Sequence, residues 1–206
     1  MPKLTRKIHH VCVSILLFTF FAAISNAQAA NKGFFWEVQG AKQPLYLLGS
    51  IHFAKSDFYP LAEHIENAFK AADNLVVEVD ISRLDPMQMQ AMILEMGTYQ
   101  ADESLADHIS TKNLTKLKDY LRRNGFPFET FAQQKPGLIV MAITSLELAK
   151  QGLSANQGID LYFIKKASGS KSILQLETIR EQFSVLLADR YAESMLSQTL
   201  DEALEY

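Results

Sequence analysis

The amino-acid sequence predicts an α/β fold with a mixed sheet, in which a parallel strand–helix–strand unit follows an N-terminal hairpin and a largely helical insertion comes next. Two apolar runs flank a turn near the N-terminus, and a helix-periodic segment separates the second run from a third. Most of the chain between residues 85 and 167 has helical periodicity. The 206 residues suit one domain, and a content of 48% hydrophobic and 21% charged residues is typical of globular proteins.

The first 29 residues have the pattern of a cleaved signal peptide. A basic start precedes an apolar run at residues 11–24, and the small-x-small sequence Ala27-Gln28-Ala29 follows. The alternative is an uncleaved anchor, but fourteen apolar residues are fewer than the roughly 20 that a spanning helix needs. We therefore predict a secreted or periplasmic protein whose domain comprises residues 30–206, with no integral membrane segment after cleavage.

Cleavage would also change the chemistry that is available. The only cysteine, Cys12, lies in the predicted signal peptide, so thiol nucleophiles and thiolate metal sites are excluded from the mature chain. Three of the 20 basic residues also lie in the predicted signal peptide. The mature chain would then have 17 basic and 23 acidic residues, a formal charge of about −6. An acidic chain without a basic cluster argues against nucleic acid as a partner.

The first elements of the domain follow from short-range signals. Residues 34–38 and 45–48 flank a turn and predict the hairpin. Pro60 is suited to open a helix, and apolar residues recur at helical spacing as far as Ala72. The short run "NLVVEVD", residues 74–80, predicts a buried strand. A right-handed crossover would then place residues 45–48 and 76–79 in one sheet, running in the same direction.

The rest of the chain is predicted to be mostly helical. The predicted helices span residues 87–96, 104–108, 113–124, 136–151 and 158–167, a strand follows at 171–177, and the remainder, 178–206, is an amphipathic helix without a stop signal. The methionines of the first of these helices suit either an adaptable binding surface or, as their spacing favours, a stripe that fills the core.

Ionisable residues follow each predicted strand. His52 follows the first strand, Glu78 lies near the end of the second, and Glu177 ends the third. Because ligands bind at the carboxyl ends of strands in open α/β sheets, we expect the three side chains to converge on one cleft. Gly49, three residues before His52, would allow a sharp backbone turn there and leave room beside it.

A histidine with two carboxylates suits a divalent metal ion or acid–base catalysis. We interpret His52 and Glu78 as metal ligands and Glu78 and Glu177 as catalytic groups; the ion is left open among manganese, cobalt and zinc. A bound ion would polarise a carbonyl or lower the pKa of a water molecule. The alternatives are structural: a histidine at a strand end that merely forms hydrogen bonds, and a glutamate that caps a neighbouring helix.

Two segments resemble the TraB/PrgY/GumN family. The first, "FFWEVQGAKQPLYLLGSIHFAKSDFYPLAEHIENAFKAADNLVVEVD", has the family's aromatic-Trp strand, Gly-x-x-His motif, Pro-initiated helix and Val-Glu strand in the same order. The second, "GIDLYFIKKASGSKSILQLETIREQ", resembles a later block of the family. The resemblance implies an α/β fold and, by relation to the TIKI metalloproteases, a metal-dependent hydrolase site.

The family pattern transfers to particular residues. Gly49 and His52 match the Gly-x-x-His motif, Glu78 matches the acidic residue of the second strand, and Glu177 lies in the matching Leu-Glu-Thr block. Asp160 matches a recurring acidic position to which we assign no role.

The chain departs from the family pattern in one respect. Family members carry a second Gly-x-x-His motif, whereas here the later histidines, His64 and His108, follow "LAE" and "LAD". His64 is predicted to be a solvated surface residue and His108 a helix-end residue. Because the sequence stops at "TLDEALEY" within a predicted helix, we expect a C-terminally incomplete domain that lacks some metal ligands.

Two functions remain open at this point. One is an exported metal-dependent hydrolase that acts on a peptide or protein substrate and whose truncated form has low activity. The other is a non-catalytic exported protein that binds a peptide or another ligand in the same cleft, for example to shut off a pheromone or other signal.

Overall fold

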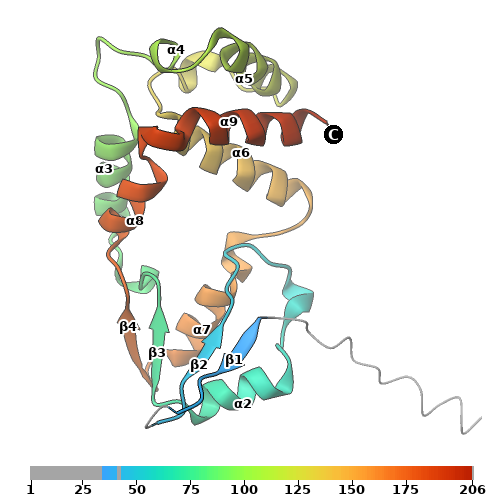
Figure 1. Cartoon of the computed structure of the whole chain (residues 1–206), viewed down its shortest axis with the longest axis vertical. Helices are drawn as coiled ribbons and strands as arrows, with labels where there is room; N and C mark the ends of the chain where they lie inside the picture. Colours follow the sequence, from blue (N-terminus) through green and yellow to red (C-terminus); the bar gives the residue numbers. More distant parts are fainter. Residues whose placement is uncertain (1–33, 41–42, 206) are drawn as a thin grey trace, which may run out of the picture.

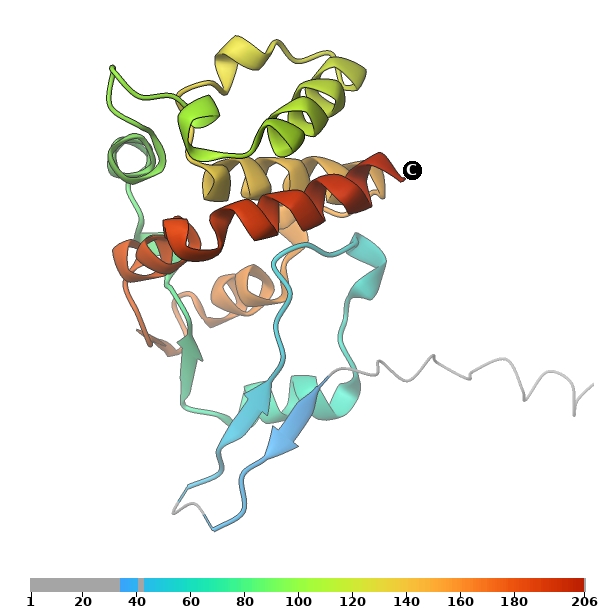
Figure 2. The same ribbon diagram turned by 45° about the horizontal axis from the view of Figure 1, so that its top comes forward.

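The computed structural model describes residues 34–40 and 43–205, so the predicted signal peptide, residues 1–29, lies outside the described residues. The described chain has a mixed α/β fold with two parts (Figure 1). One part, the strand part, contains the strands β1 to β4 with helices α2 and α7. The other, the helical part, contains α4, α5, α6 and α9 (Figure 2). Helices α3 and α8 follow β3 and β4 and connect the two parts along one side of the molecule (Figure 1).

The strand part begins with the predicted hairpin. Strands β1, Phe35–Glu37, and β2, Tyr46–Leu48, are antiparallel, with Trp36 opposite Leu47. Their turn includes Gly40, whose φ of +77° is a conformation that favours glycine. Trp36 and Leu47 lie on the exposed face of the hairpin, so the inner face provides the core contacts.

Helix α2 spans Glu63–Ala71 and places Ile65 and Ala68 in the core. It begins at Glu63 rather than at Pro60 as predicted, because Ala62 has an extended ψ of 141°. The side chain of Glu66 instead accepts a hydrogen bond of 3.1 Å from the backbone N–H of Leu61, before the helix.

Strand β3, Asn74–Val77, pairs in parallel with β4, Ser172–Gln175. The predicted fold class is confirmed, but the prediction that residues 45–48 and 76–79 share one sheet was wrong: β2 pairs with β1 and β3 pairs with β4, in separate two-stranded sheets. Leu48 of β2 and Leu75 of β3 pack against the same hydrophobic cluster. The two strands are therefore connected by a shared core and not by the hydrogen-bonded ladder that we predicted.

The remaining helices largely match their predicted positions. They are α3 at Pro86–Gly97, α4 at Leu105–His108, α5 at Thr111–Arg123, α6 at Pro136–Lys150, α7 at Ile159–Ala167, α8 at Ile179–Leu186 and α9 at Asp189–Leu204. Short 3₁₀ helices occur at Ser56–Phe58, Ile81–Arg83, Phe128–Thr130 and Ala155–Gln157.

The single helix predicted for residues 178–206 is interrupted, which corrects that prediction. Ala188 adopts an extended backbone between α8 and α9. A Cβ on Gly137 of α6 would come within 2.4 Å of the carbonyl oxygen of Leu186, so the chain turns where it meets α6. This long-range contact leaves no signal in the sequence of the helix itself.

The main core lies among α5, α6 and α9. Five of its aliphatic side chains are completely buried: Leu105, Leu117, Ile139, Leu196 and Leu200. The methionine-rich helix α3 is outside this core, because Gly97 is its only buried residue and Met87 is 80% exposed, so the prediction of a core-filling methionine stripe was wrong. No helix among the described residues is long and apolar enough to cross a bilayer.

Candidate functional site

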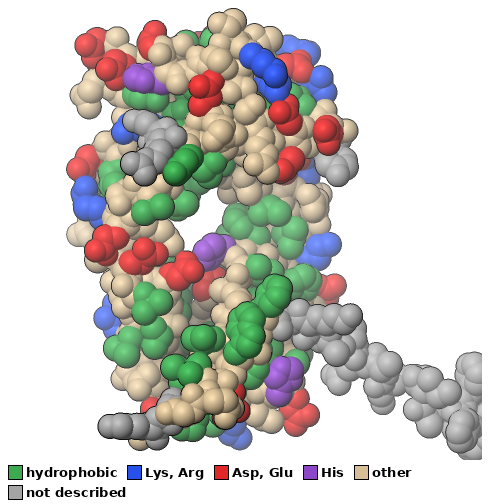
Figure 3. Space-filling view, in the orientation of Figure 1, with side chains coloured by type: hydrophobic (Ala, Val, Ile, Leu, Met, Phe, Trp, Pro, Cys, Tyr) green, Lys and Arg blue, Asp and Glu red, His purple; other side chains and the backbone are tan. Residues whose placement is uncertain are grey.

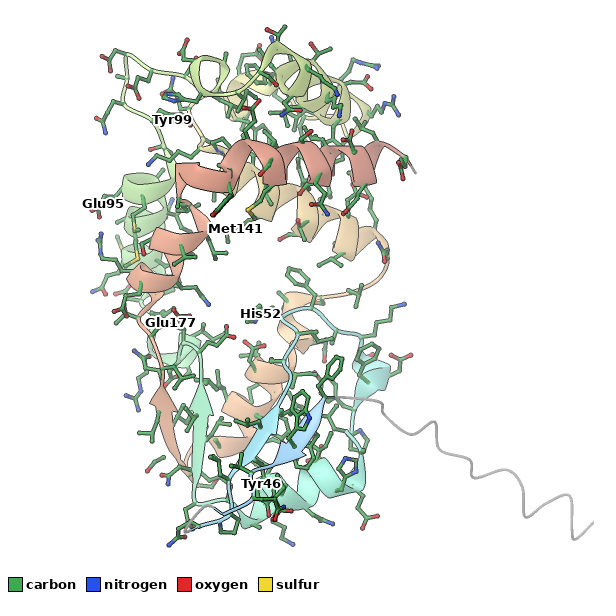
Figure 4. All side chains as sticks on the ribbon, in the orientation of Figure 1. Tyr46, His52, Glu95, Tyr99, Met141 and Glu177 are labelled. Carbon is green, nitrogen blue, oxygen red and sulfur yellow. The ribbon has the colours of Figure 1, made fainter. Side chains whose placement is uncertain are left out.

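The candidate site lies where the strand part faces the helical part. Figure 3 shows an opening through the molecule between the two parts, with a histidine and several acidic side chains along its lower rim. In Figure 4, His52 and Glu177 lie on opposite sides of this opening, with Met141 of α6 above it. The carboxyl ends of β2, β3 and β4 are therefore directed toward one shared space.

The start of α7 is fixed directly beside His52. The backbone N–H of Ile159 donates a hydrogen bond of 2.9 Å to the carbonyl oxygen of Ile51. At Gly158, a Cβ would lie 2.6 Å from the carbonyl oxygen of His52, so only glycine permits this approach. The same contact brings Asp160, in the first turn of α7, next to the imidazole.

The two nitrogens of His52 face different carboxylates. Nδ1 lies 3.3 Å from Oδ2 of Asp160, and Nε2 lies 3.9 Å from Oε2 of Glu78. The side chain of Asp160 is only 18% exposed, whereas those of His52 and Glu78 are each 61% exposed. The partly buried Asp160 therefore orients the ring, and Nε2 is the nitrogen on the open side next to Glu78.

These contacts shift the pKa values of both partners. The side-chain interaction with Asp160 is the main cause that raises the pKa of His52, and the charges of Asp160 and Glu78 act in the same direction against partial burial. For Asp160, burial favours a higher pKa, but the hydrogen bond and charge of His52 outweigh it and the pKa is lowered. Both shifts favour a charged His52–Asp160 pair.

Glu78 and Glu177 are neighbours through their backbones and through a third side chain. The N–H of Glu177 donates a hydrogen bond of 3.1 Å to the carbonyl oxygen of Glu78. Nε2 of Gln182 lies 3.4 Å from Oε2 of Glu78 and 3.4 Å from Oε1 of Glu177. The side-chain amide of Gln182 therefore lies next to both carboxylates, which follow two different strands, β3 and β4.

Sequence analysis did not predict a role for Gln182. The usable signal is the capping box at Thr178 and Glu181, which starts α8 immediately after Glu177. A helix that begins there turns the residue after Glu181 back toward the strand ends. Asp160 was noted in the sequence without a role, and its contact with His52 now supplies one.

Gly49 is not among the glycines with a positive φ. Its N–H donates a hydrogen bond of 2.7 Å to the carbonyl oxygen of Phe34 across the hairpin. A Cβ at Gly49 would lie 3.1 Å from the Cβ of Phe34, so the glycine allows close packing of the two chain segments.

The donor set at His52 suits a metal ion in part. Histidine metal ligands commonly donate their other ring N–H to a carboxylate, and the contact between Asp160 and Nδ1 has that form. Nε2 and Oε2 of Glu78 are then two donors that one ion can bridge. Within residues 34–40 and 43–205, no three His, Cys, Asp or Glu side chains are placed to hold an ion together.

The other two histidines of the predicted mature chain have different surroundings. His64 makes an edge contact with Phe35, and its ring centroid lies 5.3 Å from that of the phenylalanine. His108 stacks on Tyr99 at 4.0 Å and lies 3.4 Å from Glu103. Both residues therefore make structural contacts that do not involve His52.

Two surface pockets among the described residues lie away from His52. One, of about 650 Å³, lies beside Asn113 and α9; the other, of about 500 Å³, lies beside Asp80 and Ser172. We place the candidate site at His52 nevertheless, because the oriented imidazole and the neighbouring carboxylates carry chemistry that neither pocket offers.

Comparison with known proteins places the chain among related sequences. The sequence profile of the TraB/PrgY/gumN family matches residues 34–206. The uncharacterized protein YbaP of Escherichia coli K12 and that of Shigella flexneri are each 30% identical to the chain over 143 residues, which cover 69% of this chain and 51% of theirs. An uncharacterized protein of Treponema pallidum is 23% identical over 155 residues, which cover 74% of this chain and 46% of that protein.

The chain spans about half the length of the curated relatives that it matches. No solved structure matches it significantly.

Proposed function

The chain belongs to the TraB/PrgY/gumN family, and from this premise we propose that it acts as an exported, metal-dependent hydrolase of peptide bonds. One observation carries the proposal. The partly buried carboxylate of Asp160 faces Nδ1 of His52, and Nε2 faces Glu78 at the opening between the two parts. An imidazole held in this way presents a defined nitrogen to an ion or to a reacting group.

Each residue has a distinct role in the proposal. His52 and Glu78 bind the ion, and Asp160 orients His52. Further ligands come from water, from the substrate or from groups other than the described side chains. A divalent ion bound there would supply a polarised carbonyl or a water molecule of lowered pKa.

Glu177 is the proposed general base. It is half-buried beside Glu78, and the amide of Gln182 donates toward both carboxylates. The Gln182 donor orients one oxygen of each carboxylate and leaves the other oxygen of Glu177 to accept the proton that an attacking water molecule loses.

Export is the second part of the proposal. It is supported by the basic start, by the apolar run at residues 11–24 and by Ala27-Gln28-Ala29. Mass spectrometry of the protein recovered from the periplasm or medium is expected to give Ala30 as the N-terminus. Recovery of the soluble exported protein with Met1 intact would contradict cleavage.

Metal binding tests the site directly. We expect residues 30–206 to bind Mn²⁺, Co²⁺ or Zn²⁺ in calorimetry and His52→Ala to weaken this binding at least tenfold. His64→Ala is the matched control, because His64 is exposed and contacts only the ring of Phe35 among the recorded ring pairs. Equal affinities of the two variants would overturn the assignment of His52.

Hydrolysis is tested separately with a quenched fluorogenic peptide library. The proposal predicts chelator-sensitive cleavage that Glu177→Gln abolishes while metal affinity is retained. Metal binding without any cleavage, by the chain and by a version extended to the length of its relatives, would favour the alternative of a non-catalytic binding protein.

A further inference from the structure

Two loops meet at the candidate site, and backbone hydrogen bonds join them at two points. The first loop follows β2 and carries His52, and the second leads from α6 into α7 (Figure 1). The N–H of Ile159 bonds to the carbonyl oxygen of Ile51, and Ala54 and Ser154 form an antiparallel bridge with N···O distances of 3.2 and 2.9 Å. Because these bonds use backbone groups alone, they do not depend on the side chains at those positions.

A third link between the loops comes from the side chain of Tyr59. Its hydroxyl donates a hydrogen bond to the carbonyl oxygen of Gln157. Gln157 ends the 3₁₀ turn that begins at Ala155, and it directly precedes Gly158, the N-cap of α7. The link therefore acts on the peptide group that leads into the first turn of α7, where Asp160 lies.

The ring of Tyr59 is held in place independently of its hydroxyl. It stacks on the ring of Tyr162 of α7, with centroids 4.2 Å apart and an interplanar angle of 22°. Both rings pack against the hydrophobic cluster of Leu61, Ile65 and Phe163. Removal of the hydroxyl alone should therefore leave the ring and its packing in place.

The contact between Asp160 and His52 is sensitive to small movements of this peptide group. A Cβ on Gly158 would lie 2.6 Å from the carbonyl oxygen of His52 and 2.8 Å from Oδ1 of Asp160, so the three residues are closely packed. Oδ2 of Asp160 lies 3.3 Å from Nδ1 of His52. Hydrogen bonds from N–H to oxygen usually have distances of about 2.7–3.2 Å, so even a small outward shift of α7 would break this contact.

From these contacts we propose that Tyr59 is a positioning residue of the candidate site, whose hydroxyl holds the start of α7 so that Asp160 stays in contact with His52. This inference deepens the proposed function, on which its relevance to metal binding rests. The effect on the orientation of the His52 ring does not require a metal ion.

Hydrogen exchange of single amides tests the link. The variant is Tyr59→Phe in residues 30–206, measured in EDTA, because it removes only the hydroxyl. We expect the amide of Ile159 to exchange at least tenfold faster than in the unsubstituted chain, while that of Ser168, at the other end of α7, stays within twofold. Equal acceleration of both amides would indicate general loosening of α7 and would overturn the proposal.

Tyr162→Phe is the matched control. It also loses one tyrosine hydroxyl, which donates a hydrogen bond of 2.6 Å to Oε1 of Glu66 in α2. Glu66 keeps its ion pair with Lys166 and its hydrogen bond from Leu61, so α7 remains attached to α2. We expect the Ile159 amide to stay within twofold in this variant. A tenfold increase in both variants would assign the effect to the packing of α7 and overturn the role of the Tyr59 hydroxyl.

The tautomer of His52 is a readout that a purely structural role would not change. At pH 9, long-range ¹H–¹⁵N NMR measures which nitrogen of the neutral ring carries the proton. We expect the ratio of rings protonated on Nδ1 to rings protonated on Nε2 to fall at least threefold in Tyr59→Phe and to stay unchanged in Tyr162→Phe. An unchanged ratio in Tyr59→Phe would overturn the proposal, even if that variant were less stable.

Failure of this inference can be distinguished from failure of the proposed function, because the exchange and tautomer measurements are made in EDTA. A chain that binds no Mn²⁺, Co²⁺ or Zn²⁺ but shows both effects in Tyr59→Phe would refute only the metal site. Metal binding at His52 with neither effect in Tyr59→Phe would refute only the role of Tyr59.

Discussion

The helical part and the strand part of the molecule bury their apolar residues to different extents. In the helical part, ten buried residues form one cluster, and Leu117, Ile139 and Leu196 within it are completely inaccessible. In the strand part, the corresponding cluster has three buried residues, Leu61, Ile65 and Phe163. The helical part therefore has the larger share of the hydrophobic stabilisation.

The polar and ionisable side chains of the candidate site, in contrast, lie mainly on the strand part. The contact of His52 with Asp160, the nearby Glu78 and the amide of Gln182 all lie on or beside the strand part. Functional segments are commonly drawn from the less stable end of a structure, because they must remain accessible or move. The comparison indicates that the helical part supports the fold while the strand part presents the site.

The largest expected effect is a loss of stability, and it tests whether the helical part depends more on buried side chains than the strand part does. Leu196→Ala in α9 removes a completely buried side chain and should lower the free energy of unfolding by about 2–5 kcal/mol. Leu47→Ala in β2 truncates a side chain that is 53% exposed and should cost less than about 1 kcal/mol. Urea unfolding monitored by circular dichroism measures both, and equal losses would remove the distinction between the two parts.

A smaller loss of stability is expected for Gly158→Ala, at the point where α7 begins beside His52. In Gly158→Ala, the new methyl group would meet the carbonyl oxygen of His52 at 2.6 Å and Oδ1 of Asp160 at 2.8 Å. The overpacking should cost about 1–3 kcal/mol in unfolding free energy and separate His52 from Asp160, which lowers the pKa of His52.

Gly125→Ala serves as the control for this variant. Gly125 has a positive φ of +77° and open space around its Cα, so the substitution strains the backbone without touching the site. An unchanged His52 pKa in Gly158→Ala, or an equal change in Gly125→Ala, would show that the close approach of α7 does not set the His52–Asp160 contact.

The next prediction separates the two carboxylates that face His52. Asp160→Asn should lower the pKa of His52 more than Glu78→Gln does, because Asp160 is the largest cause of the raised value and Glu78 the smallest. Titration of the imidazole by NMR measures both variants. A larger decrease in Glu78→Gln would mean that the exposed glutamate, and not the partly buried aspartate, is the principal partner of His52.

The same contact predicts a small pH dependence of stability. A raised His52 pKa contributes stability that is fully present below the ordinary value of about 6.5 and is lost as pH rises through the folded-state pKa. The lowered Asp160 pKa contributes stability above about 3.8 that is lost as pH falls through its folded-state value. Asp160→Asn should therefore reduce the urea midpoint more at pH 5 than at pH 8; the reverse order would contradict the pairing.

The sequence predicted the features that depend on neighbours along the chain. The hairpin, most helices and the positions of His52, Glu78 and Glu177 at strand ends follow from periodicity and turn residues. The split into two sheets could not be predicted in this way, because β3 pairs with β4, and helices α3 to α7 lie between these two strands in the sequence. The break after α8 likewise depends on Gly137 of a distant helix.

The roles of two site residues also required the three-dimensional structure. Asp160 is brought to His52 by the hydrogen bond between Ile159 and Ile51, a contact between segments more than 100 residues apart. Gln182 reaches Glu78 and Glu177 because a capping box starts α8 directly after β4. Neither contact follows from the spacing of the residues in the sequence.

The orientation of His52 is central to the proposed site, and long-range ¹H–¹⁵N NMR of the imidazole during a Zn²⁺ titration tests it directly. With Asp160 next to Nδ1, the neutral ring is expected to carry its proton on Nδ1, and Zn²⁺ should shift the Nε2 resonance while Nδ1 keeps its proton. Asp160→Asn should weaken that preference. A neutral ring protonated on Nε2, or a Zn²⁺ titration that leaves Nε2 of His52 unchanged, would contradict the proposed site.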